Sequence, residues 1–307
     1  MSTTTITPLP TGRQHVLELG GQRAVVTAVG ASVREYTVDG RDVVLPFDES
    51  EIPPAFSGAV LAPWPNRLRD GVYVYDGEQY VVPLTEHAPR LTALHGLVAQ
   101  TAFTTVDADS TSVTLEHVVV PTWGYPWPVR LQLQYTLTEA GLHVRAEATN
   151  LGTSTAPYGI GFHPWLSPGD ASVDDCTLQV DAERHVTVDD RLLPTGSERV
   201  ADGFDLRSAR RLEGLDLDDA WVQPIRDADG LSWIRLGCPD GRTVAMWADD
   251  ATKAWQVCTG DTVAHISRRG VAAEPMTCIA DAFRTGSDLV HLAPGASHTI
   301  TWGLALL

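Results

Sequence analysis

Apolar and polar residues alternate along many short stretches of this chain, and the alternation predicts β-strands from one end to the other. The clearest case is residues 129–137, where every second residue is apolar, followed after a short polar turn by the alternating residues 142–148. A period of two places one face of a strand against a core and the other in solvent. The two segments therefore predict an antiparallel pair that is buried on one face.

Turn-forming dipeptides separate other strand-like runs. Asp39-Gly40 divides residues 33–47, and Asp76-Gly77 divides residues 72–82. Aspartate followed by glycine suits the positive φ angles of a two-residue hairpin loop, so both positions predict hairpins. Further strands are expected at residues 233–236 and 243–247, which flank a Pro-Asp-Gly turn, and at residues 299–302.

No stretch shows the periodicity of an amphipathic helix over three turns, and 26 glycines and 20 prolines interrupt the strands. The chain has no low-complexity linker and no repeat of fixed period. We therefore expect residues 1–307 to form one large all-β domain with two or more packed antiparallel sheets. The pattern leaves jelly roll, sandwich and other double-sheet topologies open.

Composition and charge restrict the partners of this protein. A net charge of −17 repels nucleic acid and anionic membranes, so we expect neither as a partner. No apolar run approaches the ~20 residues of a membrane span, and residues 1–10 lack the basic and apolar regions of a secretory signal. The four cysteines form no Cys-x-x-Cys pair, which indicates buried thiols of a cytoplasmic protein rather than a zinc site.

Residues 156–166 combine features that suit a sugar site. His163 precedes a proline, which favours an extended and stiff backbone, and two glycines nearby leave room for a ligand. Trp165 offers a flat apolar face of the kind that stacks on the C–H face of a sugar. A second segment that precedes a proline supplies the carboxylate of Glu274. We therefore hypothesise an acid–base pair held on two rigid segments.

These segments resemble a known family. His163-Pro164-Trp165 and Glu274-Pro275-Met276 are similar to the two catalytic segments of the aldose 1-epimerase (galactose mutarotase) family. Other similar segments occur in the same order over roughly residues 58–285: Trp64-Pro65-Asn66-Arg67, Leu94-His95-Gly96, Gly124-Tyr125-Pro126-Trp127 and Leu217-Asp218. The resemblance implies the large antiparallel β-sandwich of the galactose mutarotase type, with the site in a cleft on a concave sheet face.

The resemblance also implies roles for individual residues. Glu274 would be the base that takes the proton of the C1 hydroxyl, and His163 the acid that protonates the ring oxygen. The implied substrate-binding residues are Arg67, His95, Asp218, Asn66, Trp165 and Tyr125. Taken without the resemblance, each has a structural alternative: Arg67 as a loop arginine paired with Asp70, His95 as a structural histidine, Tyr125 as core packing. Asp219 is not excluded as the aspartate that contacts the sugar in place of Asp218.

The expected activity is the interconversion of the α and β anomers of a free aldose, without a cofactor or a metal. Partial burial can raise the pKa of Glu274 towards neutral pH, whereas attraction between the two catalytic groups is expected to raise the pKa of His163 and to lower that of Glu274. One alternative is a non-catalytic sugar-binding protein of the same fold. Another is a mutarotase for a sugar phosphate, although only three arginines lie near the candidate segments. A cupin-like metal enzyme is disfavoured because no His-x-His spacing occurs.

Overall fold

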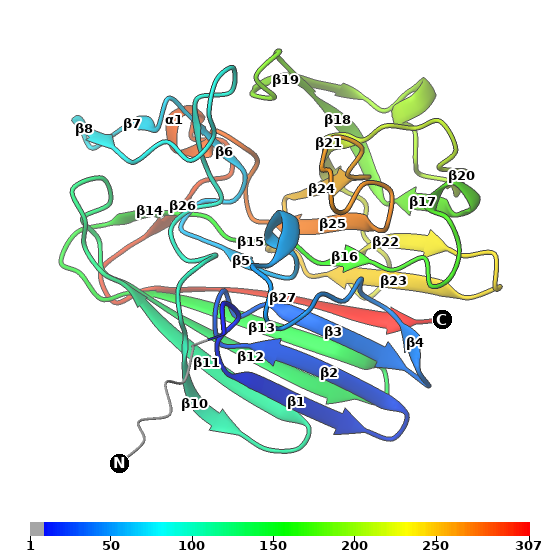
Figure 1. The fold of residues 1–307 in the computed structure, drawn as a ribbon. Helices are drawn as coiled ribbons and strands as arrows, with labels where there is room; N and C mark the ends of the chain where they lie inside the picture. Colours follow the sequence, from blue (N-terminus) through cyan, green and yellow to red (C-terminus); the bar gives the residue numbers. More distant parts are fainter. Residues whose placement is uncertain (1–8) are drawn as a thin grey trace.

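The computed structural model describes residues 9–307, and Figure 1 shows its strands stacked in layers. The start of the chain, where no secretory signal was predicted, lies almost wholly outside this range. The helical elements of the described residues are short: α1 (Ala282–Thr285) and the 3-10 turns η1 (Pro54–Phe56), η2 (Val173–Asp175) and η3 (Asp202–Phe204). The structure therefore confirms the predicted all-β class.

The largest sheet has nine strands in the order β10-β11-β12-β13-β27-β23-β22-β17-β20. Its strands are β10 (Thr104–Ala108), β11 (Ser112–Val119), β12 (Val129–Thr138), β13 (Gly141–Asn150), β17 (Thr177–Val180), β20 (Arg210–Arg211), β22 (Ser232–Gly237), β23 (Thr243–Ala248) and β27 (Ser297–Leu306). The predicted antiparallel pair is β12 with β13, in which Leu133 lies opposite Ala146. The strands predicted at 233–236 and 243–247 pair as β22 and β23.

A second sheet of eight strands has the order β19-β18-β21-β24-β25-β15-β5, with β16 paired to β25. Its strands are β5 (Val60–Leu61), β15 (Gly161–Phe162), β16 (Trp165–Leu166), β18 (Ala182–Val188), β19 (Pro194–Arg199), β21 (Asp218–Pro224), β24 (Ala254–Cys258) and β25 (Val271–Met276). In Figure 1, β24, β25 and β15 lie above β22, β23 and β27 of the nine-stranded sheet.

Smaller sheets complete the described fold. A four-stranded sheet joins β1 (Gln14–Leu19), β2 (Gln22–Thr27), β3 (Val33–Val38) and β4 (Arg41–Asp42), and it packs on β11 and β12. The two-stranded pairs are β6 (Arg67–Arg69) with β9 (Thr92–Leu94), β7 (Val72–Tyr75) with β8 (Glu78–Val81), and β14 (Ala156–Tyr158) with β26 (Val290–Leu292). Both Asp-Gly hairpins are confirmed, as β3–β4 and β7–β8.

Aromatic side chains join the two large sheets. Phe162 of β15 packs on Trp302 of β27 with ring centroids 5.1 Å apart. Trp255 of β24 is fully buried and donates from Nε1 to the Ser232 hydroxyl of β22 at 2.9 Å. Truncating a buried aromatic residue of this kind to alanine typically costs about 3–5 kcal/mol. The face of the eight-stranded sheet that carries these residues is therefore core, and the alternate residues of its strands point to the opposite face.

No helix of residues 9–307 is long and apolar enough to cross a bilayer.

Candidate active site

Strand register brings His163 and Glu274 together. β25 pairs with β15 through Met276 and Gly161, and with β16 through Ala272 and Trp165. Residue 163 lies between those two positions and therefore faces residue 274. The His163 Nε2 atom lies 3.3 Å from Glu274 Oε1, and the side chains are only 8% and 3% exposed. The structure thus brings the two predicted catalytic residues into direct contact.

The backbone on either side of His163 is held by hydrogen bonds. His163 N–H donates to the Ala59 carbonyl at 3.0 Å, and the His163 carbonyl accepts from Gly58 N–H at 2.8 Å. The Pro164 carbonyl accepts from Ala273 N–H of β25 at 3.1 Å. The imidazole also stacks on Trp165, with centroids 5.8 Å apart. Little freedom is left to this histidine except through rotation of its own side chain.

Burial sets the protonation of this pair. It raises the pKa of Glu274 well above its usual value, and the nearby Asp218 carboxylate adds to the rise. Burial also lowers the pKa of His163 to about 4. The rise at Glu274 agrees with the expected effect of burial, whereas the expected rise in the pKa of His163 was wrong, because burial removes solvation from its charged form. Both shifts favour the neutral form of the side chain.

Each member of the pair keeps a polar atom that the protein leaves unused. Glu274 Oε2 and His163 Nδ1 are buried and have no hydrogen-bond partner among the described residues. Buried polar atoms are normally satisfied, and exceptions are common at functional sites. The free carboxylate oxygen is available to a substrate hydroxyl.

Arg67 is oriented by an acidic partner. Its Nε and Nη2 atoms donate to the Glu86 carboxylate at 2.9 and 3.2 Å, in the two-pronged geometry that suits a guanidinium. Asp70 pairs instead with Arg191 at 2.8 Å, so the alternative pairing of Arg67 with Asp70 is wrong. Glu86 fixes one edge of the guanidinium, and Arg67 lines the cavity.

His95 and Asn66 are locked to each other. The Asn66 N–H donates to His95 Nδ1 at 3.2 Å, and the His95 N–H donates to the Asn66 carbonyl at 2.9 Å. An accepting Nδ1 leaves the proton of the neutral ring on Nε2. Burial, with smaller effects of His163 and Arg67, holds the pKa of His95 well below its usual value. His95 is therefore a neutral donor, fixed in orientation.

Strand alternation distinguishes Asp218 from Asp219. Asp218 points to the cavity, and its Oδ1 accepts a hydrogen bond from Gln256 Nε2 at 2.9 Å. Asp219 points to the other face of β21 and accepts from His185 Nε2 at 2.8 Å. Asp219, which the sequence did not exclude as a sugar-binding residue, is thus turned away from the cavity.

These residues enclose a cavity of about 260 Å³. Seven of the eight predicted site residues line it, namely Glu274, His163, Arg67, His95, Asp218, Asn66 and Trp165. Tyr125 does not. It is fully buried, donates its hydroxyl to the Pro157 carbonyl at 2.9 Å and packs on Trp127. The position of Tyr125 thus does not support substrate contact, and it braces the strand β14 that leads to His163.

Several cavity residues were not predicted from the sequence. Ala55 and Phe56 of η1 both have positive φ angles, of 47° and 55°, and the Phe56 ring meets the edge of His95 at 4.7 Å. Cys258, Thr262 and Val263 line another wall. Phe56 lies in an irregular turn without periodicity, and two preceding prolines were the only local signal.

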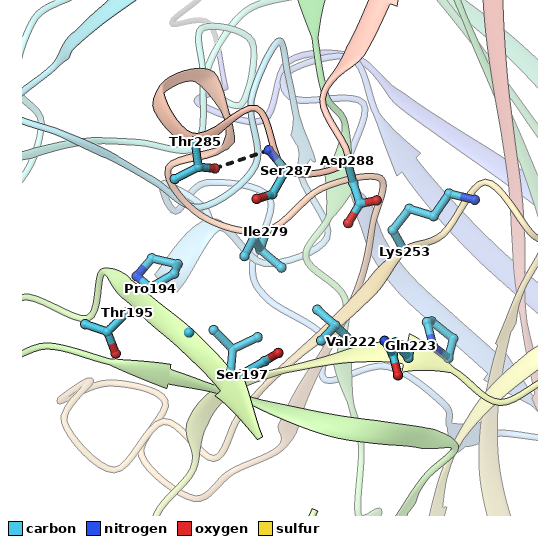
Figure 2. Close-up of a pocket in the computed structure, with 13 residues that line it drawn as sticks. Pro194, Thr195, Ser197, Val222, Gln223, Lys253, Ile279, Thr285, Ser287 and Asp288 are labelled. Carbon is cyan, nitrogen blue, oxygen red and sulfur yellow. Dashed lines mark hydrogen bonds between the residues drawn. The ribbon is translucent and has the colours of Figure 1, made fainter. Parts of the chain in front are cut away.

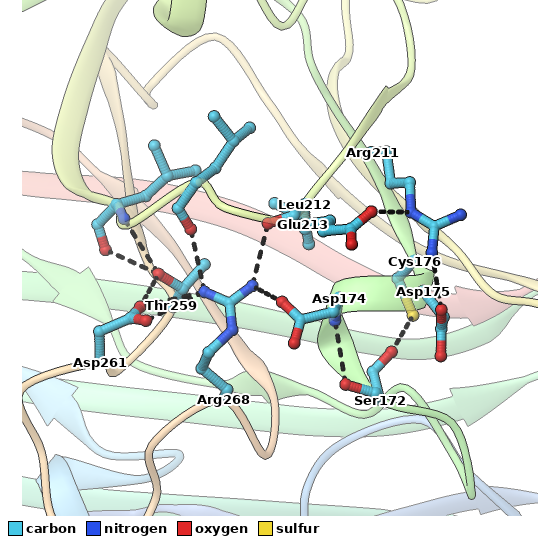
Figure 3. A network of polar contacts seen from close by, with 12 residues as sticks. Ser172, Asp174, Asp175, Cys176, Arg211, Leu212, Glu213, Thr259, Asp261 and Arg268 are labelled. Atoms are coloured by element: carbon cyan, nitrogen blue, oxygen red, sulfur yellow. Dashed lines mark hydrogen bonds and ion pairs between the residues drawn. The ribbon is translucent and has the colours of Figure 1, made fainter.

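A single arginine anchors the loop that carries Thr262 and Val263 (Figure 3). Arg268 Nη1 donates to Asp261 at 3.0 Å and to the Leu215 carbonyl at 2.9 Å, and Nη2 donates to the Leu212 carbonyl at 2.9 Å. Leu215 and Leu212 belong to the segment that leads into Asp218. Arg268 therefore ties two walls of the cavity together.

Two further cavities lie along β21. One of about 20 Å³ is lined by Asp218 and Ala220, and an outer chamber of about 550 Å³ is lined by Val222 and Gln223. Figure 2 shows the outer chamber, with Val222 and Gln223 of β21 facing Ile279. Both spaces share Pro194 and Ile279 as lining residues.

No group of three or more His, Cys, Asp or Glu side chains within residues 9–307 is arranged to hold a metal ion. The site can therefore be described from its own acidic, basic and hydrogen-bonding side chains. It combines a histidine–glutamate pair, a fixed guanidinium, a neutral imidazole donor and a carboxylate acceptor around a cavity of about 260 Å³.

Comparison with known proteins places this geometry in context. The family model for aldose 1-epimerase matches residues 13–304. The uncharacterised protein YihR of Escherichia coli (strain K12) is 34% identical over 303 residues, which cover 95% of this chain and 93% of YihR. Galactose mutarotase of Bos taurus is 28% identical over 194 residues, 59% of this chain and 55% of that protein.

Solved structures show the same fold. The aldose epimerase homologue from C. elegans superposes with a TM-score of 0.83 at 21% identity, covering 96% of this chain and 99% of that one. Galactose 1-epimerase from Lactobacillus acidophilus NCFM gives a TM-score of 0.80 at 19% identity, covering 95% and 93%. The predicted mutarotase-type β-sandwich is therefore confirmed.

Proposed function

This chain belongs to the aldose 1-epimerase family, and we propose that it interconverts the α and β anomers of a free aldose by acid–base ring opening and reclosure. The observation that supports this most strongly is the buried contact of 3.3 Å between His163 and Glu274, which both line a cavity of about 260 Å³, together with the buried Glu274 oxygen that has no partner among the described residues.

The proposed reaction moves two protons. Glu274 takes the proton of the C1 hydroxyl through Oε2, and His163 gives a proton to the ring oxygen, so that the bond between C1 and the ring oxygen breaks. The open aldehyde rotates about C1–C2 and recloses on its other face, and the two protons return. No electron transfer is involved, and the residues supply both proton-transfer groups.

The pKa shifts of the pair imply a preparatory step. Burial favours the protonated form of Glu274, whereas the proposed base must be ionised. The direct contact of Nε2 with Oε1 provides a path for this proton to reach His163. We propose that hydroxyl groups of the bound sugar stabilise the resulting carboxylate–imidazolium pair, because they replace part of the solvation that burial removed.

The remaining cavity residues hold the sugar in place in this proposal. Arg67 Nη1 and His95 Nε2 donate to hydroxyl oxygens, Asp218 accepts from hydroxyl groups, and Asn66 fixes the ring of His95. Trp165 is only 2% exposed, so its main contribution is to support the His163 ring. Phe56 covers the opposite side and offers an apolar face for C–H groups.

We propose a neutral aldose as the substrate. Glu86 already neutralises Arg67, and Asp218 adds a further acidic side chain to the cavity lining. Arg90 keeps a second candidate open, because it lines the cavity and its Nη1 has no partner among the described residues. That candidate is an aldose with an acidic substituent, such as a sugar phosphate. We also propose a cytoplasmic location, since all four cysteines are unpaired.

Polarimetry of freshly dissolved single anomers tests the proposal. The purified protein should accelerate equilibration of at least one neutral aldose, and Glu274→Gln should return the rate to the uncatalysed value. A larger kcat/KM for a hexose 6-phosphate would favour the acidic substrate. Binding of aldoses by calorimetry without any acceleration would contradict the enzymatic proposal and favour a sugar-binding protein.

A further inference from the structure

Two cysteines far from the cavity face each other across neighbouring strands. Cys176 directly precedes β17 and Cys238 directly follows β22, and the last paired residues of these strands are Thr177 and Gly237. Cys176 and Cys238 therefore occupy the next pair of positions in the same register. Both are free thiols and both are buried.

The backbone at this position leaves the two cysteines as a pair without hydrogen bonds between them. Cys176 N–H donates to the Val173 carbonyl at 3.1 Å, and Cys238 N–H donates to the Arg242 carbonyl at 2.9 Å. Such antiparallel pairs have Cα atoms about 4.5 Å apart. That separation lies within the range of about 4.4–6.8 Å that a disulfide bridges.

The two thiols influence each other's ionisation. Cys176 is the largest cause of a lowered pKa of about 7 for Cys238, and Cys238 raises the pKa of Cys176. Figure 3 shows Cys176 beside Ser172, whose carbonyl lies 3.5 Å from the Cys176 sulfur. The pair thus contains one sulfur that ionises readily and one neutral partner.

Arg41 supplies the positive charge at this pair. Its Nη2 donates to the Cys238 sulfur at 3.2 Å, while its Nε donates to Asp240 at 3.1 Å. Arginine beside a thiol favours the thiolate, which is the reactive form. Arg41, which contacts the Cys238 sulfur, and Pro239, which follows Cys238 in the chain, both line a hollow on the surface.

We propose that Cys176 and Cys238 are a reversible oxidation site, which a peroxide converts into a cross-strand disulfide between β17 and β22. The Cys238 thiolate attacks one peroxide oxygen, so that the O–O bond breaks, hydroxide leaves and a sulfenic acid forms. The Cys176 sulfur then attacks the Cys238 sulfur, the S–S bond forms, and the S–O bond breaks. The proton of the Cys176 thiol joins the departing hydroxide to form water. Two thiols are oxidised by two electrons, and one hydrogen peroxide is reduced to two waters.

The structure contains its own control thiols. Cys278 is fully buried, and burial raises its pKa to about 12. Cys258 lies in the wall of the cavity, and burial raises its pKa as well. Neither has Arg41 as a neighbour, so a thiolate-dependent oxidation should spare both.

Peptide mapping of the peroxide-treated full-length protein tests the proposal. After alkylation of the remaining thiols under denaturing conditions, we expect one cross-linked peptide joining Cys176 to Cys238, with Cys258 and Cys278 alkylated. Dithiothreitol should reverse the link. In Cys176→Ser, oxidation should stop at a sulfenic acid on Cys238, which dimedone traps. The oxidised wild type should melt at a higher temperature, because the link restricts the unfolded chain.

Arginine variants test whether oxidation of Cys238 depends on the charge of Arg41 or only on the solvent exposure of the thiol. Arg41→Gln should slow oxidation of Cys238 about threefold or more, since less thiolate is present. Arg242→Gln, in the same surface hollow, should oxidise at the wild-type rate. Equal oxidation of all four cysteines, over-oxidation of Cys238 without a cross-link, or an unchanged rate in Arg41→Gln would overturn the proposal. These measurements do not depend on any sugar activity.

Discussion

Two histidine–carboxylate pairs lie on opposite faces of the eight-stranded sheet. His163 and Glu274 face the cavity with 3.3 Å between Nε2 and Oε1, and His185 and Asp219 face away from it with 2.8 Å between Nε2 and Oδ1. The histidine side chains are almost equally shielded, at 8% and 7% exposure. Judged by residue type and distance alone, the second pair is the better acid–base candidate.

The difference lies in what else each carboxylate does. The Oδ2 atom of Asp219 accepts the Asp218 N–H at 3.1 Å, so both of its oxygens are used. His185 is covered by Phe204, with ring centroids 3.7 Å apart. Glu274 keeps Oε2 unused and lines a cavity. A free acceptor and space for a ligand therefore distinguish the proposed catalytic pair from the second pair.

The largest effect is expected from Glu274→Gln. This change keeps the volume and removes the base, and general acid–base groups typically contribute about 10²–10⁴-fold to a rate. The rate of anomer equilibration, measured by polarimetry, should fall towards the uncatalysed value while circular dichroism shows a folded protein. A rate within a few-fold of wild type would remove Glu274 from the role of base.

His163→Asn should lose a similar factor, because ring opening needs both proton transfers. The double variant His163→Asn with Glu274→Gln should be hardly slower than either single variant, since groups that act as a unit are not additive. The wild type should be active in the one-proton state of the pair. Its acidic limb should therefore lie near the pKa of about 4 of His163, and its alkaline limb at the raised pKa of Glu274. Losses that multiply in the double variant would contradict a coupled pair.

Arg67→Lys should have an intermediate effect. Lysine keeps the charge but cannot serve Glu86 and a substrate hydroxyl from one planar group. We expect kcat/KM to fall about tenfold, which corresponds to one hydrogen bond to a charged group. The melting temperature should change little. Normal kinetics with a large fall in melting temperature would show a structural role for Arg67.

The stability of Glu274→Gln should depend on pH in a defined direction. Burial raises the pKa of Glu274 in the folded state, so between pH 4.5 and that value the folded protein binds more protons than the unfolded chain. Wild-type stability therefore falls as the pH rises through this range. Glutamine does not titrate, so the variant lacks this fall in stability. It should melt a few degrees above wild type at pH 8 but not at pH 4. A lower melting temperature at pH 8 would contradict the assignment of the shift to burial.

The smallest kinetic effect is expected from Asp219→Asn, the matched change in the second pair. It should leave kcat within about threefold of wild type, because neither oxygen of Asp219 reaches the cavity. Replacing a buried partner of a charge-assisted hydrogen bond should cost about 1–3 kcal/mol in the free energy of unfolding. Urea denaturation measures this loss. A fall in kcat as large as that of Glu274→Gln would remove the distinction between the two pairs.

Strands and hairpins could be predicted from the sequence where a local pattern of residues specifies them. Alternation located β12 and β13, and Asp-Gly dipeptides located two hairpins. The X-Pro segments and the family resemblance pointed to His163 and Glu274, which the structure places in contact.

Properties that arise only from packing could not be predicted. The direction of the pKa shifts depends on burial, which no motif encodes. Tyr125 shows that an aromatic residue beside prolines does not indicate the direction of its own side chain. Phe56 sits in a turn with two consecutive positive φ angles, which the sequence does not signal. Only the alternation of side chains along β21 determines that Asp218 faces the cavity and Asp219 does not.

The register of β25 has a consequence for the order of events in folding. His163 and Glu274 are more than a hundred residues apart in the chain, and they meet only when β15 and β16 have both paired with β25. Such non-local pairings form slowly, because closing a long loop costs entropy before any contact compensates for it. Hairpins such as β12–β13 can form much earlier. During refolding from denaturant, the proposed anomerase activity should therefore return later than the β-sheet signal in circular dichroism. The recovery of activity would then report when the last long-range pairing, that of β25 with β15 and β16, is complete.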